Sequence, residues 1–172
     1  MSLATRAQSF VVDVNRPGNI IRSAWDRLES LPGGKRLFSR LVGQAAPYTG
    51  TLGAQVCELR KGYARVTLHD RRRVRNHLGS VHAVALANLA ELTANVAMAY
   101  TLPDDARFIV AGMSIEYVKK ARGVITGESN CPVPVNSEKK TYEVPVVMRD
   151  AQGEEVARAT LFSLVGPKKR HS

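Results

Sequence analysis

Glu91 is the residue whose position in this sequence most needs a chemical explanation. From Asn76 to Pro103 the chain contains no other carboxylate and no Lys or Arg, and most of the surrounding residues are apolar. A carboxylate in an apolar helix loses hydration, which disfavours its charged form and makes it a stronger base or a poised nucleophile for a substrate that reaches it. The sequence therefore indicates a general base or nucleophile at Glu91.

The residues before Glu91 can supply the other half of a site. Ser80 is a favourable N-cap, which predicts a helix whose first three residues, 81–83, present unpaired backbone N–H groups. Such a helix end can stabilise an oxyanion. Glu91 follows Ala83 by eight residues, or about 12 Å along the axis, so one helix cannot bring both groups to one carbonyl. A two-fold homodimer with antiparallel helices would join them across its interface.

Composition limits the class of protein and of partner. A chain of 172 residues, 44% hydrophobic, fits one globular domain. The formal charge of +10 favours a negatively charged partner, which would be nucleic acid, an anionic membrane surface or a phosphorylated ligand. Cys57 and Cys131 lack the spacing of a disulfide framework or a metal site, so neither is expected. Residues 1–16 lack the features of a secretory signal, which predicts a cytoplasmic protein.

The periodicity of apolar residues changes along the chain. Residues 19–31 and 35–43 have helical spacing, whereas alternation with a period of two begins after Gly50 and predicts a hairpin around Lys61-Gly62. A long apolar helix follows from Ser80, and the polar residues that interrupt it favour a buried helix over a membrane span. About four more strands are expected after it, with a turn at 150–153.

This order of elements predicts an α+β fold in which a curved antiparallel sheet wraps around one long central helix. We expect residues 1–48 to form an N-terminal helical extension, 49–166 the main domain and 167–172 a basic mobile tail. A sheet of this size cannot enclose the whole circumference of an apolar helix. The exposed remainder must meet another surface, which again favours a homodimer.

The spacing of four residues resembles a known family motif. Asn76, His82-Ala83 six and seven positions later, and Glu91 fifteen positions after Asn76 are similar to hotdog-fold acyl-CoA thioesterases of the phenylacetate-pathway type. Those proteins have an Asn, then His-Gly-Gly, then Asp or Glu. RNHLGSVHAVALANLAEL followed by GMSIEYVKKARG looks most like an uncharacterised hotdog group. The resemblance covers about residues 50–165 and implies the hotdog fold, hydrolysis of acyl-CoA thioesters and a dimeric site, and it is compatible with a dimer of dimers.

The resemblance also implies a role for each matching residue. Ala83 would donate its N–H to the thioester oxygen, Glu91 would act as base or nucleophile, Asn76 would position water or the carboxylate, and His82 would support the loop. Coenzyme A would be bound as part of the substrate near Lys119, Lys120 and Arg122, and no other cofactor and no metal is expected. This chain has Ala83 and Val84 in place of both glycines, which narrows the approach to the site.

Other interpretations of the same residues stay open. Glu91 could be a structural acid paired with an Arg, or it could simply face solvent. His82 could be a structural histidine, and Asn76 only a turn residue. A non-hydrolytic module that binds acyl-CoA or an acyl carrier protein is a second hypothesis. A nucleic-acid-binding protein is a third hypothesis, which rests on charge alone because aromatic residues make up only 6% of the chain and no stacking platform is found. We therefore expect no nucleic acid partner.

Overall fold

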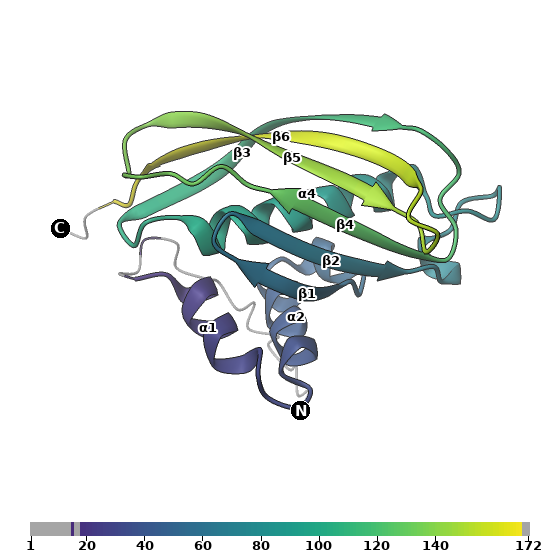
Figure 1. The fold of residues 1–172 in the computed structure, drawn as a ribbon, viewed down its shortest axis with the longest axis horizontal. Helices are drawn as coiled ribbons and strands as arrows, with labels where there is room; N and C mark the ends of the chain where they lie inside the picture. The colour runs from purple at the N-terminus through teal and green to yellow at the C-terminus, as the bar shows by residue number, and fades with distance from the viewer. Residues whose placement is uncertain (1–14, 16–17, 170–172) are drawn as a thin grey trace, which may run out of the picture.

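The computed structural model describes residue 15 and residues 18–169. Its elements are, in order, α1 (Ile20–Leu28), α2 (Gly34–Ala45), α3 (Pro47–Gly50), β1 (Gln55–Arg60), β2 (Tyr63–His69), η1 (Arg72–Val74), α4 (Ala83–Thr101), β3 (Ala106–Tyr117), β4 (Val124–Asn130), β5 (Lys140–Arg149) and β6 (Glu155–Pro167). The six strands form one curved layer with α4 against it, α1 is joined to the end of α4, and α2 lies beside β1 (Figure 1).

The sheet has the strand order β1-β2-β4-β5-β6-β3, and every neighbouring pair is antiparallel. The predicted hairpin is confirmed: Arg60 pairs with Tyr63, and Gly62 between them has a φ of 76°, which glycine adopts without steric cost. The predicted turn before the last strand is confirmed as well, with the Asp150 carboxylate accepting N–H groups from Gln152 and Glu154. β3 is an edge strand that pairs only with β6 among the described strands.

The predicted central helix is α4, and it packs against the sheet through a row of small residues. Ala90, Ala94 and Ala97 are completely buried, which lets the helix backbone approach the strands closely. The approach is tightest at Gly127 of β4, where a Cβ atom would lie 2.8 Å from the Thr93 hydroxyl oxygen. A sheet curved around a central helix in this way is the hotdog fold, so the predicted α+β class and architecture are confirmed.

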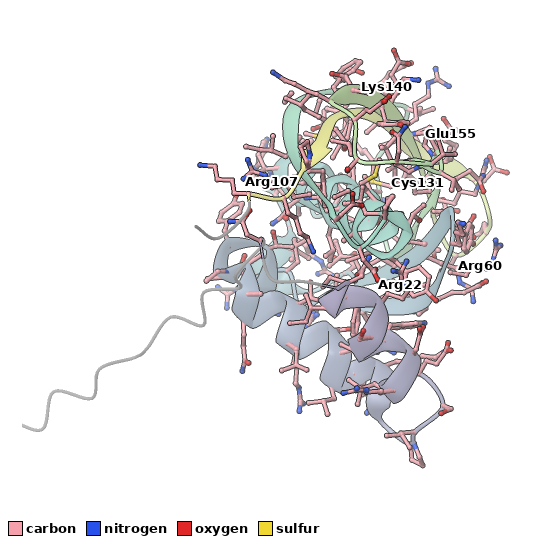
Figure 2. All side chains as sticks on the ribbon, turned by 90° about the vertical axis from the view of Figure 1, so that its left-hand side faces the viewer. Arg22, Arg60, Arg107, Cys131, Lys140 and Glu155 are labelled. Atoms are coloured by element: carbon pink, nitrogen blue, oxygen red, sulfur yellow. The ribbon has the colours of Figure 1, made fainter. Side chains whose placement is uncertain are left out.

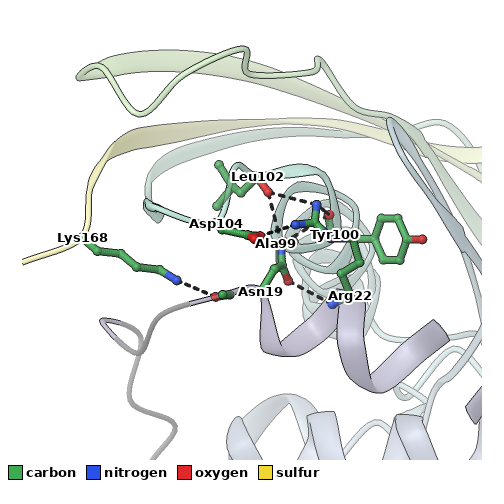
Figure 3. A network of polar contacts seen from close by, with 8 residues as sticks. Asn19, Arg22, Ala99, Tyr100, Leu102, Asp104 and Lys168 are labelled. Carbon is green, nitrogen blue, oxygen red and sulfur yellow. Dashed lines mark hydrogen bonds and ion pairs between the residues drawn. The ribbon is translucent and has the colours of Figure 1, made fainter. Parts of the chain in front are cut away.

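The N-terminal helices cover part of the side of α4 that the sheet leaves open. Trp25 of α1 and Phe38 of α2 are both 1% exposed and meet edge to face, with ring centroids 5.0 Å apart. Asn19 ties α1 to α4, because its Oδ1 accepts the Arg22 N–H at 2.9 Å and its Nδ2 donates to the Ala99 carbonyl at 2.7 Å (Figure 3). Part of the surface of α4 that a second protomer was expected to cover is therefore covered by the chain itself.

α4 is the one helix in the described chain that is long and apolar enough to span a membrane, with a mean hydropathy of 1.2. In the fold, 61% of that stretch is buried by the chain itself. Its apolar character is accounted for by its place in the core, as the sequence predicted.

The expected limits of the segments stay a prediction. α3 ends at Gly50 and β6 at Pro167. Within the predicted basic tail, the Lys168 N–H donates to the Asp105 carbonyl at 2.8 Å and its Nζ donates to the Gly18 carbonyl at 2.7 Å. Residues 1–14, 16–17 and 170–172 lie outside the described part of the chain, and so do nearly all of the residues on which the absence of a secretory signal was judged.

Candidate functional site

The start of α4 differs from the sequence prediction in its N-cap. The cap is His82, not Ser80, and its Nδ1 accepts the Val84 N–H at 3.1 Å. The helix begins two residues later than predicted because the residues before it are held in extended form: the Val81 N–H donates to Ala121 at 2.8 Å, and the His82 N–H donates to Val74 at 2.8 Å. Ser80 is buried instead of capping the helix.

Ala83 is the first residue of α4, and its N–H has no hydrogen-bond partner among the described residues. Its carbonyl accepts the Tyr117 hydroxyl at 3.1 Å, and partial burial raises the pKa of that hydroxyl. The side chains of His82, Ala83 and Val84 are all exposed. The positive end of a 19-residue helix therefore presents the unpaired Ala83 N–H at the surface, which is the kind of group that an oxyanion requires.

Asn76 organises the loop that precedes α4. Its Oδ1 accepts the N–H of Leu78 at 2.9 Å and both the N–H and the hydroxyl of Ser80, at 3.3 and 3.2 Å. Its own N–H donates to the Ser80 carbonyl at 2.9 Å. The side-chain oxygen is thus committed to the turn, as the plainer interpretation holds. The Asn76 Nδ2 has no partner in the described part of the chain, so it can still donate to a ligand.

The same loop is fixed to the sheet by Asp70, a residue to which the sequence analysis gave no role. Its Oδ1 lies 2.6 Å from the Arg75 Nε, and its Oδ2 accepts the Gly123 N–H at 3.1 Å. The Asp70 side chain is 8% exposed. The hydrogen bond from Arg75 holds the pKa of the Asp70 carboxyl below its ordinary value, so this clamp is charged at neutral pH.

Glu91 lies in the middle of α4 and is half-buried. Within the described residues its carboxylate makes no ion pair and no hydrogen bond, so the proposed pairing with an Arg of the same chain finds no support. It stands on the same straight helix as Ala83, about 12 Å further along the axis. The chain therefore brings His82, Ala83 and Asn76 together at one end of α4 and leaves Glu91 apart from them.

Asn88 is a candidate residue whose spacing from Glu91 was visible in the sequence but was given no function. It is 5% exposed, and its Oδ1 is buried without a hydrogen-bond partner in the described chain. It lines a cavity of about 420 Å³ at the start of α4, together with Tyr48, Arg73, Arg75, His82 and Val84 among others. An unpaired amide in such a cavity can hydrogen-bond a ligand or water.

Two of the three cations expected to bind the nucleotide are free for that role. Lys119 is engaged, because its Nζ lies 2.8 Å from the Asp150 carboxylate and lowers the pKa of that group. Lys120 and Arg122 are exposed and form no ion pair with a described residue. They flank Ala121, which binds Val81, so both lie close to the start of α4.

Among the described residues, no three side chains of His, Cys, Asp or Glu are grouped so that they could hold a metal ion. The groups available at the site are unpaired backbone N–H groups at the start of α4, one unpaired carboxylate, two amides and free cations. This set can stabilise an oxyanion and activate water, provided that Glu91 and an Ala83 N–H meet.

Solved structures of other proteins share this fold. A genomics target designated APC5556 is 33% identical, with a TM-score of 0.74, over 86% of this chain and 98% of that chain. A protein of unknown function from Pseudomonas aeruginosa, described as a probable thioesterase, is 23% identical with a TM-score of 0.69, over 80% and 97% of the two chains. A thioesterase from Haemophilus influenzae is 16% identical with a TM-score of 0.66, over 77% and 90%. At the last two identities the likeness shows the fold alone.

No curated protein matches this chain. A family model does match, over residues 34–165, which include α2 to β5 and most of β6. The chain therefore belongs to the family described as a domain of unknown function, DUF4442.

Proposed function

We propose that this chain hydrolyses acyl-CoA thioesters at a site shared by two protomers. The observation that carries the proposal is the separation of two unpaired groups on α4: the Ala83 N–H at its start and the Glu91 carboxylate about 12 Å along it. Each is half of an acyl-transfer site, and a second copy in antiparallel orientation supplies the missing half. The thioesterase described from Haemophilus influenzae has the same fold.

The proposed reaction needs no cofactor. Glu91 takes a proton from water, and the resulting hydroxide attacks the thioester carbonyl carbon. The tetrahedral oxyanion accepts a hydrogen bond from the N–H of Ala83 of the partner subunit. The C–S bond then breaks, the carboxylic acid forms, and the CoA thiolate takes up the proton. Direct attack by Glu91 through an anhydride, which water then hydrolyses, uses the same two groups.

The exposed edge of β3 supports a homodimer. Ile109 is 65% exposed and Met113 is 39% exposed along this edge strand, and a long apolar edge is a template for pairing with another strand. The end of β3 also contacts the start of α4, through Tyr117 and Ala83. A copy that paired along β3 would thus lie beside the proposed oxyanion donor. Two such dimers could associate further.

Free cations and free cysteines are consistent with the proposed substrate and its compartment. The free cations Lys120 and Arg122 at the start of α4 match the phosphates of coenzyme A. The free cysteines Cys57 and Cys131 suit a reducing cytoplasm. Burial raises the pKa of the Cys131 thiol to about 12, so this thiol is not a nucleophile at neutral pH.

The test is the Glu91→Gln variant, with thiol release measured for acyl-CoAs of several chain lengths. We expect turnover to fall at least about 100-fold, because a general base contributes a factor of this order, and the oligomeric state to stay unchanged. Glu138→Gln removes an exposed carboxylate far along the chain and should keep wild-type turnover. Unchanged hydrolysis in Glu91→Gln would refute the assignment.

A non-hydrolytic acyl-CoA or acyl-carrier-protein module is the second candidate. The commitment of the Asn76 oxygen to its own loop and the exposed Val84 side chain favour it, because both reduce what the site can offer to a water molecule and a substrate. Tight binding of an acyl-CoA by the wild-type protein without any thiol release would establish this function in place of hydrolysis.

A further inference from the structure

A second cavity lies at the opposite end of α4 from the oxyanion donor. It has a volume of about 350 Å³ and is bounded by α1, the end of α2, the second half of α4 and the start of β3. Its walls are mainly apolar, with contributions from Ile21, Val42, Leu92, Val96, Ala99 and Phe108. A cavity of this size and character fits the range of small-molecule sites.

The position of this cavity on α4 relates it to Glu91. Its wall begins with Leu92, the next residue, and continues with Asn95, which lies one helical turn, or about 6 Å, beyond Glu91. On α4 the cavity thus begins one residue beyond Glu91 and extends away from the start of the helix. The roof is α1, which Asn19 and Arg22 hold to the end of α4 through the Ala99, Tyr100 and Leu102 carbonyls (Figure 3).

Cations lie near both ends of α4, and the apolar lining of the second cavity is what distinguishes its end. The free cations Lys120 and Arg122 lie near the start of α4, where phosphates would be held. At the other end, Arg107 and Lys168 border the apolar cavity, and Lys168 already donates to Gly18. Figure 2 views this end of the molecule, where Arg22 and Arg107 both project near the N-terminal helices. The apolar lining of the cavity fits the acyl end of a thioester, and the free cations near the start of α4 fit its phosphates.

We propose that the cavity roofed by α1 receives the acyl chain of the substrate, and that it selects a linear chain of up to about twelve carbons. The limit follows from the volume of about 350 Å³ and a share of roughly 30 Å³ per water-sized group. The inference rests on the proposed function, since it places the thioester at Glu91 with its chain directed along Leu92, Val96 and Ala99.

The first experiment is a series of saturated acyl-CoAs from two to sixteen carbons, assayed by thiol release. We expect kcat/KM to rise by about fourfold for each added methylene, the factor that corresponds to burial of one such group, and to stop rising near twelve carbons. A value of kcat/KM that is independent of chain length would overturn the proposal.

Two variants fill the cavity from opposite walls. Ala99→Phe adds a ring from α4, and Ala46→Phe adds one from the exposed segment between α2 and α3, where a fold defect is not expected. Each should lower the chain length at which kcat/KM stops rising by several carbons, so that the loss of kcat/KM relative to wild type grows with chain length. Ser23→Phe, on the exposed side of α1, is the matched control and should leave the dependence of kcat/KM on chain length unchanged. If both variants lost kcat/KM equally at all chain lengths, the assignment of the cavity to the acyl chain would be contradicted.

Calorimetry separates this inference from the proposed reaction. Decanoyl-CoA should bind the Glu91→Gln variant at least about 100-fold more tightly than acetyl-CoA, given several buried methylenes, and Ala46→Phe should remove most of that difference. Equal affinity for the two ligands would overturn the chain pocket even if hydrolysis is found. A length-dependent affinity without thiol release in the wild type would keep the pocket and refute the hydrolase.

Discussion

The two ends of α4 differ in whether their backbone groups have hydrogen-bond partners. At the C-terminal end, the carbonyls of Ala99, Tyr100 and Leu102 accept hydrogen bonds from Asn19 and Arg22. These carbonyls therefore have partners, and the bonds hold α1 in place. At its start, one N–H of the first turn is taken by His82, while that of Ala83 has no partner in the described chain. A helix end that is left incomplete at the surface is available for a ligand, whereas a completed one serves the fold.

The largest expected effect is on turnover, when the Ala83 N–H is removed without disturbing the helix. Ala83 occupies the first helical position, where proline is well tolerated, and the preceding His82 has the extended ψ of 141° that proline requires. Ala83→Pro should therefore fold normally and lose about 100-fold to 1,000-fold in kcat, the usual cost of one oxyanion donor. Ala83→Gly keeps the N–H and should stay active. Thiol release from decanoyl-CoA measures both, and full activity of Ala83→Pro would exclude this donor.

Substitutions at the C-terminal end of α4 should change the stability of the fold and not the rate of turnover. Asn19→Ala removes the N-cap of α1 and its bonds to α4, which should lower the free energy of unfolding by about 1–2 kcal/mol. Asn19→Asp keeps the acceptor for the Arg22 N–H but loses the donors, so it should lie between the variant and wild type. Urea unfolding measures the series. A fall in kcat for acetyl-CoA without a loss of stability would contradict the distinction between the two ends.

A smaller effect is expected from the clamp beside the incomplete end. Since the folded pKa of Asp70 is lowered by Arg75, its contribution to stability is complete above the ordinary carboxyl pKa and is lost as pH falls through the folded value. Asp70→Asn should therefore lower the midpoint of thermal unfolding at pH 7, and the difference from wild type should shrink below pH 4. A difference that is the same at pH 7 and pH 3 would show that the charge of Asp70 does not matter.

Local patterns in the sequence predicted the fold well but not the details of the site. Alternation after Gly50 and the long apolar run predicted the hairpin, the central helix and the later strands, because burial on one face or all round leaves a direct periodic signal. The N-cap was placed at Ser80 because local propensity favours it. The structure moves it to His82 through a bond between Val81 and Ala121, forty residues away, which no local pattern contains.

The same limit applies to charges and to the N-terminal helices. The ion pair of Lys119 with Asp150 joins residues from separate turns, so local sequence patterns could not distinguish Lys119 from the neighbouring cations. Helical periodicity predicted residues 19–31 and 35–43 as helices but contained no information on which surface they cover. Their place over α4 follows from contacts such as Asn19 with Ala99, and it creates the apolar cavity.

A heterodimer of two inactive variants tests most directly whether one site is built from two protomers. Ala83→Pro and Glu91→Gln chains with different affinity tags can be produced together and the mixed dimer purified. If each site takes its Ala83 N–H from one protomer and Glu91 from the other, one of the two sites in the mixed dimer is intact, and thiol release should return to about half of the wild-type rate. If both groups of a site came from one chain, the mixed dimer would be as inactive as each parent, and that result would contradict the account.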